Sequence, residues 1–166
     1  DIIAMTKKMA CERREFETMY VEKDSEEQEV DVPVRVLVTP DAAEFAALGP
    51  QPPEASGYDV VLFVTVVYGD TDSVMPKLIR FNEDLCDAAW EAVGSYCADR
   101  ITEEFKAKFA AMGYPESWII LEYEKLFRGY MLDKKKRYAG IKYEAPDDAG
   151  ELDSKGLECV RRDTCR

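Results

Sequence analysis

The clearest hydrophobic pattern in the chain is an apolar run at residues 60–67, which is rich in β-branched side chains. Such a run is typical of a buried strand, and Gly69 permits a turn directly after it. A second, shorter apolar stretch begins at Val74. The pattern therefore predicts a β-hairpin over residues 59–79, with two aspartates at its turn.

Helical spacing dominates the next part of the chain. Apolar residues recur every three or four positions over residues 85–112, after Asn82 as a candidate N-cap. Gly113 and Pro115 then supply a stop signal. A shorter pattern of the same kind covers residues 2–19. We expect two helices, with the aromatic residues of the longer one in the core.

Three strand-like segments follow the long helix, at Trp118–Glu124, Phe127–Leu132 and Tyr138–Tyr143. A hairpin, then a long helix, then further strands is an order typical of α+β domains. We therefore expect an α+β fold in which helices pack on one face of an antiparallel sheet.

Residues 21–58 differ in character from the rest of the chain. They open with an acidic run at 22–29, continue with a short valine-rich piece at 32–38, and contain three prolines between 50 and 53. We expect a solvated, partly disordered acidic and proline-rich insert. An acidic tether for a protein partner is the alternative interpretation.

Composition narrows the chemistry that the chain can perform. The sequence has 166 residues, a net charge of −12 and no histidine, which excludes His-based triads and imidazole metal ligands. Its five cysteines are widely spread and form no Cys-x-x-Cys, which argues against a disulfide framework or a zinc site. No apolar stretch approaches the length of a transmembrane helix, so we expect no membrane partner.

The two aspartates of the predicted turn, Asp70 and Asp72, are the first candidate site. Side chains two positions apart on an extended backbone point the same way, and hard divalent cations prefer oxygen ligands. The spacing therefore indicates a metal site. For an isolated Asp-x-Asp, a pair of solvated turn residues is the alternative.

Two further groups of charged residues follow. Glu122 and Glu124 repeat the two-residue spacing within an apolar segment. They are either the solvent-exposed face of a strand or additional negative charge near metal ions. The basic run Lys134–Arg137 directly precedes the small residues Ala139 and Gly140. Long cations beside a backbone that can be closely approached are suited to binding phosphates.

Taken in order along the chain, these motifs resemble the palm of family B DNA polymerases, most nearly the eukaryotic delta group of that family. The motifs are Tyr68-Gly69-Asp70-Thr71-Asp72-Ser73, Leu121-Glu122-Tyr123-Glu124-Lys125, Lys135-Lys136-Arg137-Tyr138-Ala139-Gly140, Lys155-Gly156-Leu157-Glu158 and Val160-Arg161-Arg162-Asp163. The resemblance implies a DNA-directed DNA polymerase with a palm-type sheet, which acts in DNA replication in the nucleus. It also implies primer–template DNA, deoxynucleoside triphosphates, the remainder of the polymerase chain and accessory replication subunits as partners.

The resemblance also implies roles for individual residues. Asp72 would bridge two Mg²⁺ ions, and Asp70 would be its less essential neighbour, serving an accessory ion together with Glu122 and Glu124. The expected DNA-binding residues are Lys135, Lys136, Arg137 and Tyr138 at the primer–template duplex, and Arg161 and Arg162 near the thumb.

The family's other metal-binding aspartate, its fingers, thumb and exonuclease domain have no match here, so we expect a piece of a larger polymerase that is inactive alone. The expected divisions are 1–20 as a helix leading into the palm, 21–58 as the insert, 59–152 as the palm subdomain and 153–166 as the start of the palm-to-thumb connection. Two other functions fit parts of the sequence. They are a metal-dependent glycosyltransferase with an Asp-x-Asp site and a non-catalytic acidic interaction module.

Overall fold

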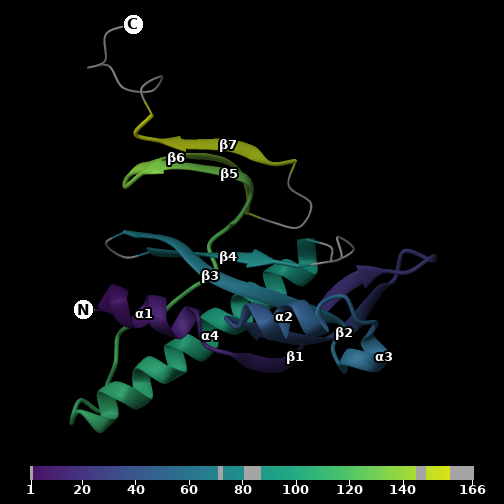
Figure 1. The fold of residues 1–166 in the computed structure, drawn as a ribbon, viewed down its shortest axis with the longest axis horizontal. Helices are drawn as coiled ribbons and strands as arrows, with labels where there is room; N and C mark the ends of the chain where they lie inside the picture. The colour runs from purple at the N-terminus through teal and green to yellow at the C-terminus, as the bar shows by residue number, and fades with distance from the viewer. Residues whose placement is uncertain (1, 71–72, 81–86, 145–148, 158–166) are drawn as a thin grey trace, which may run out of the picture. The chain divides into compact units, whose positions relative to one another are not determined.

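The fold is that of a computed structural model, which describes residues 2–70, 73–80, 87–144 and 149–157. The chain forms two compact units, Asp1–Tyr123 and Glu124–Arg166 (Figure 1). The first unit contains α1 (Ile2–Ala10), β1 (Arg14–Lys23), β2 (Glu29–Thr39), α2 (Ala42–Leu48), α3 (Pro53–Ser56), β3 (Val60–Asp70), β4 (Ser73–Ile79) and α4 (Asp87–Ala111). The second contains β5 (Leu126–Lys134), β6 (Arg137–Tyr143) and β7 (Glu151–Lys155).

The fold is α+β, and the sheet of the first unit is mixed. Its strand order is β1-β2-β3-β4, with β2 and β3 parallel and the other neighbours antiparallel. Parallel neighbours need a crossover connection, and α2 and α3 lie within the segment that joins β2 to β3. The expected antiparallel sheet is therefore not confirmed for this unit. The second sheet, β5-β6-β7, is antiparallel throughout.

Helices cover both faces of the first sheet, whereas the sequence pattern predicted only one. On one face, valines of β2 and alternate residues of β3 form a buried cluster with Val93 of α4. Side chains alternate along a strand, so Phe63 of β3 points to the opposite face, where its ring lies 5.7 Å from that of Phe45 on α2. The crossover thus places α2 on the face that α4 leaves open.

The helix predicted over residues 2–19 ends at Ala10, and a strand begins at Arg14. Phe16 and Tyr20 are four residues apart, a spacing that fits a helix and also fits one face of a strand. Pairing decides between the two, because every residue of β1 from Arg14 to Lys23 has a partner on β2. Stacking of the Phe16 ring on Tyr96 of α4, with centroids 3.9 Å apart, anchors this strand to the core.

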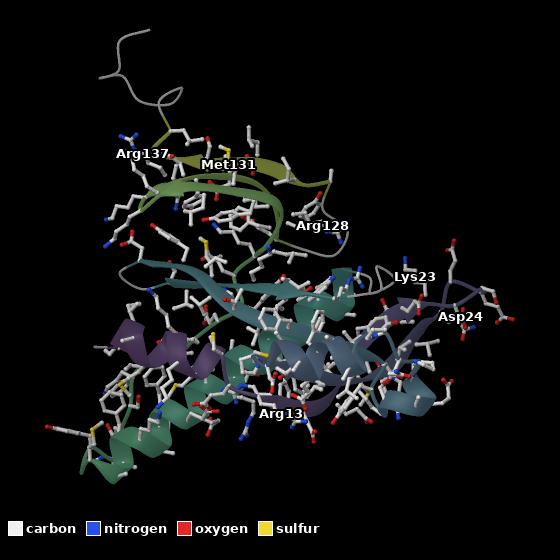
Figure 2. All side chains as sticks on the ribbon, in the orientation of Figure 1. Arg13, Lys23, Asp24, Arg128, Met131 and Arg137 are labelled. Carbon is white, nitrogen blue, oxygen red and sulfur yellow. The ribbon has the colours of Figure 1, made fainter. Side chains whose placement is uncertain are left out.

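Residues 21–58 form regular structure, and the expectation of a disordered insert is wrong for them. The acidic run folds into the β1–β2 turn, where Asp24 Oδ1 accepts the backbone N–H of Glu26 at 2.8 Å and of Gln28 at 3.0 Å. Lys23 and Asp24 mark the outer end of this hairpin in Figure 2. Pro53 is the first residue of α3, a position where the missing N–H of proline costs nothing.

The valine-rich piece within that segment lies in β2, a strand of the core. Val36 and Leu37 of β2 are fully buried. Arg13 joins the start of β1 to α2, because its guanidinium donates to Glu44 at 2.8–3.1 Å (Figure 2). Burial of Val36 and Leu37 supplies folding free energy that an isolated acidic loop would lack.

Of the three strands predicted after the long helix, two are confirmed as β5 and β6. Residues 118–124 form no strand, although their side chains alternate between exposed and half-buried. Among the residues that the structure describes, no helix has the length and apolar character needed to cross a membrane.

Candidate metal and nucleic-acid site

The predicted hairpin is present, and Asp70 lies at its end. Asp70 is the last residue of β3 and pairs with Ser73, the first residue of β4. The Tyr68 hydroxyl donates to the Asp70 carboxylate at 3.4 Å, and the Ser73 hydroxyl donates to the Asp70 carbonyl oxygen at 3.3 Å. Asp72 lies outside the described residues. The structure therefore places one of the two candidate carboxylates, half-buried at the turn.

A β-bulge lies just before this turn and determines which way Asp70 points. Val66 pairs with Pro76 and Tyr68 with Met75, so Val67 is the extra residue on β3. Proline donates no N–H to a neighbouring strand and is tolerated at such irregular positions. Because side chains alternate along a strand, one inserted residue turns every later side chain to the other face.

The aliphatic stem of Lys7, on α1, lies over Gly69 at the same turn. An ideal Cβ built at Gly69 would lie 2.5 Å from Lys7 Cε and 3.3 Å from Lys7 Nζ. Lys7 is half-buried, and within the described residues it makes no hydrogen bond or ion pair. Sequence reasoning missed this contact, because nothing in the pattern of α1 links Lys7 to a hairpin some sixty positions later.

The segment that carries Glu122 is held against α4 by its apolar residues. Leu121 packs with the Phe105 cluster, and its backbone N–H donates to the Thr102 hydroxyl at 2.9 Å. Burial, with a smaller contribution from nearby Glu91, raises the pKa of Tyr123. Glu122, between these inward residues, is therefore exposed.

Glu124, in the second unit, pairs with a lysine in this structure. Its carboxylate lies 3.1 Å from Lys125 Nζ, which also lies 3.4 Å from Asp153. Burial alone would lower the pKa of Lys125, but the two carboxylates outweigh it and leave the pKa raised. Across the described ranges, no three Asp, Glu, Cys or His side chains gather as a metal site. The expected grouping of Asp70 with Glu122 and Glu124 stays a prediction.

The basic run forms the tight turn between β5 and β6. Lys134 pairs with Arg137 across the turn, and Lys135 and Lys136 occupy its tip. The three lysines are exposed, and Arg137 is half-buried at the start of β6 (Figure 2). The turn thus presents several cations within a few residues, on a backbone fixed by strand pairing.

Tyr138 differs from its neighbours because only 4% of its surface is exposed. Its ring lies 6.0 Å from that of Phe127 and 5.4 Å from that of Tyr130, centroid to centroid. Lys155 Nζ lies 5.9 Å from the Tyr138 ring. Tyr138 therefore supports the basic turn from within the second unit.

The motifs at 135–140 and 155–156 meet in space. Tyr138 of β6 pairs with Lys155 of β7, and Gly156 follows with a φ of +64°. A side chain at Gly156 would clash with the carbonyl oxygen of Lys136, so this glycine permits the close approach of β7 to the turn. Arg161 and Arg162, the other expected DNA contacts, lie outside the described residues.

Comparison with known proteins identifies the family to which the chain belongs. Residues 2–166 match the sequence model of DNA polymerase family B, and the chain belongs to that family. It is 42% identical, over 99 residues, to a DNA polymerase of Paramecium bursaria Chlorella virus NY2A. This match covers 59% of the chain and 10% of the viral polymerase.

Cellular relatives carry the name of one particular polymerase. The chain is 42% identical over 101 residues to the DNA polymerase delta catalytic subunit of Plasmodium falciparum, covering 61% of the chain and 8% of that protein. It is 37% identical over 110 residues to the same subunit of Drosophila melanogaster, covering 66% and 9%. The chain thus spans a tenth or less of the length of these relatives.

Proposed function

We propose that this chain is part of the palm of a replicative DNA-directed DNA polymerase, which adds deoxynucleotides to a primer 3′-hydroxyl. The observation that carries the proposal is the β3–β4 hairpin, which places Asp70 at its end within a chain of the polymerase family. This family membership removes the basis for the glycosyltransferase interpretation. The palm-type assignment of the sheet, and the division into palm (59–152) and connection to the thumb (153–166), belong to the same proposal.

The residues at the hairpin fit Mg²⁺ in their donor chemistry. Asp70 offers a hard carboxylate, oriented by the Tyr68 hydroxyl, and Asp72 is the second carboxylate of the turn. When bound, Mg²⁺ in a two-ion site activates the attacking hydroxyl and stabilises charge on the transferring phosphate. Asp72 would be the principal ligand of the ions and Asp70 a supporting one, and Glu122 and Glu124 would add negative charge near an accessory ion.

The chain's own residues contribute mainly position and charge. Lys135 and Lys136, at an exposed turn, are suited to the phosphates of a primer–template duplex, and Arg137 adds a third cation. Tyr138 would hold that turn in place by packing beneath it. We assign Arg161 and Arg162 to the duplex backbone nearer the thumb.

The complete enzyme would act in the nucleus, with deoxynucleoside triphosphates and DNA as substrates and accessory replication subunits as partners. Because the chain covers a tenth or less of its relatives, its catalytic centre would be completed by other parts of the polymerase. We therefore expect no primer extension by these 166 residues alone.

Primer extension by the full-length protein tests the proposal. The unmodified protein should extend a primer in Mg²⁺, and Asp72→Ala should abolish extension while leaving primer–template affinity nearly unchanged. Asp70→Ala should reduce extension less. Extension that survives Asp72→Ala would reject the metal assignment, and a full-length protein that extends no primer would reject the function.

A further inference from the structure

The first sheet has two edge strands, β1 and β4, and they differ in how easily a further strand could pair with them. β4 contains Pro76, which donates no N–H, and the neighbouring strand β3 carries the bulge at Val67. β1 contains no proline, and its ten residues pair with β2 without any shift of register. Within the described residues no strand pairs with its outer edge. β1 therefore offers a regular edge, on which every second residue directs its N–H and C=O groups outward.

Packing against α4 holds this edge in place. The Phe16 ring stacks on Tyr96, and the Arg14 guanidinium donates to Glu104 of the same helix and to the Met9 carbonyl oxygen. Figure 1 shows β1 at the margin of the first unit. An incoming strand would therefore meet a backbone that is already extended, which lowers the entropy cost of binding.

One row of side chains on β1 is exposed along its length. Because side chains alternate along a strand, this row lies on the face opposite Phe16. Its members are Glu15, Glu17, Met19 and Val21, with Met19 59% and Val21 50% exposed. A strand added at the edge would bring its own alternate side chains beside this row. Basic side chains suit the two glutamates, and apolar side chains suit Met19 and Val21.

Charge selects the occupant of this edge. Residues 15–31, which form most of the β1–β2 hairpin, contain eight acidic residues and a single lysine. A second copy of β1 would bring like charges together, which destabilises strand pairing. A segment rich in lysine or arginine would instead be attracted. Basic arms of this kind are common in proteins that bind nucleic acid.

We propose that the outer edge of β1 is a docking site for a basic extended segment of another protein, which adds to the first sheet as a further antiparallel strand. Antiparallel addition places apolar residues beside Val21 and Met19, followed by basic residues beside Glu17 and Glu15. The peptide Val-Thr-Val-Thr-Lys-Thr-Lys has this order, with threonines on the other face. The inference goes beyond the proposed polymerase function and does not depend on it.

Binding of this peptide to the full-length protein tests the inference. The labelled peptide, acetylated and amidated at its ends, is followed by fluorescence anisotropy. Two further peptides are N-methylated, one at every threonine and the other at the remaining residues. Only alternate N–H groups of a paired strand face its neighbour, so one methylated peptide should lose affinity on the order of tenfold or more and the other should bind nearly as the parent does. Hydrogen exchange at residues 14–23 should slow when the parent peptide binds.

A charge change on the exposed row gives a second test. Glu17 is suited to it, because Glu15 already pairs with Arg13. Glu17→Gln should weaken peptide binding roughly threefold, as expected for one cross-strand pair of opposite charges. Glu54→Gln on α3 is the matched control: Glu54 is also exposed, and both glutamates help to raise the pKa of Arg35. The control should bind the peptide as the unmodified protein does.

The apolar part of the row is tested in the same way. Met19→Gln keeps a side chain of similar size and removes its apolar character, so it should weaken binding. Met112→Gln is its matched control, because Met112 is 56% exposed and lies just after α4 instead of on β1. Binding through Met112 should be unchanged.

Three outcomes would overturn the inference. Equal affinities for the two methylated peptides would show that the backbone of β1 does not pair with the peptide. Equal weakening by Glu17→Gln and Glu54→Gln would show that only net charge attracts it. A full-length protein that binds no peptide, with residues 14–23 already protected from exchange, would show that another part of the polymerase covers the edge. Failure of primer extension would reject the proposed function and leave this docking site unaffected.

Discussion

The ring of Tyr123 lies over Gly94 of α4 and fills the space that a side chain at residue 94 would need. Tyr123 is the last residue of the first unit, and Leu121, two residues before it, is hydrogen-bonded to Thr102 of the same helix. The missing Cβ at Gly94 therefore allows the segment that carries Glu122 to lie close against α4.

Replacing Gly94 by Ala should destabilise the protein, although alanine is the better helix former by about 1 kcal/mol. The new methyl group would overlap the Tyr123 ring, and overpacking of this kind costs about 1–3 kcal/mol. Urea unfolding measures the net loss. In a Tyr123→Ala background the clash is gone, so Gly94→Ala should there be neutral or stabilising. The same loss in both backgrounds would show that the ring is not the cause.

Replacing Gly156 by Ala should destabilise the second unit more than replacing Gly129 by Ala. Both glycines have a φ of +64°, so both changes incur the same left-handed backbone cost of about 1–2 kcal/mol. Only Gly156 has a neighbour in the way, the carbonyl oxygen of Lys136, whereas a Cβ at Gly129 meets open space. The excess loss in urea unfolding should be at least about 1 kcal/mol. Equal losses would contradict the close approach of β7 to the basic turn.

Much of the fold could be predicted from local sequence patterns, and the predictions that proved wrong share a physical cause. The hairpin at 59–79 and the strands β5 and β6 carry their own turn signals and alternation. Residues 118–124 alternate as a strand would, yet Leu121 finds its backbone partner in the Thr102 side chain. Whether an extended segment becomes a strand depends on a neighbour that the local sequence does not reveal.

Tertiary pairing also explains why the predictions for residues before 59 were wrong. Phe16 and Tyr20 satisfy a helical period, but pairing of β1 with β2 makes them part of a strand, where both are half-buried against the core. The acidic run at 22–29 suggested disorder, whereas Asp24 caps a turn between two paired strands. The contact of Lys7 with Gly69 joins two distant segments, so no local pattern could predict it.

Ionisation of the Cys97 thiol, on α4, should lower the stability of the protein in alkaline solution. Burial raises the pKa of this thiol from 9.0 to about 11, with the Arg14 charge acting weakly in the opposite direction. Between these values the unfolded chain releases a proton that the folded chain keeps, so the free energy of unfolding decreases as the pH rises. A shift of this size corresponds to about 2–3 kcal/mol.

Unfolding measured between pH 8.5 and pH 11 checks this expectation. Cys97→Ala lacks the thiol, so its stability should decline less over the same range, although tyrosines and lysines still titrate. Cys11→Ala is the matched control. Cys97 packs against the buried cluster that β2 and β3 form with Val93 of α4, whereas Cys11 does not belong to that cluster. Parallel declines in the unmodified protein and Cys97→Ala would exclude a buried thiol as the source.

Replacing Lys135 and Lys136 by Ala in the full-length protein should weaken primer–template binding and flatten its dependence on salt. Each phosphate contact by a lysine releases about 0.9 of a counterion from duplex DNA, so losing two contacts should reduce the slope of log K against log salt by about 2. Fluorescence anisotropy with a labelled primer–template, at several salt concentrations, measures this slope.

The double change Lys106→Ala and Lys108→Ala is the matched control for that experiment. These lysines are exposed on α4, and Lys106 pairs with Glu103 at 2.8 Å. Their loss changes the net charge by the same amount, but the slope should stay near that of the unmodified protein. An equal slope for all three proteins would show that the basic turn does not contact the duplex. Equal flattening in both variants would show that net charge, not the position of Lys135 and Lys136, controls the affinity.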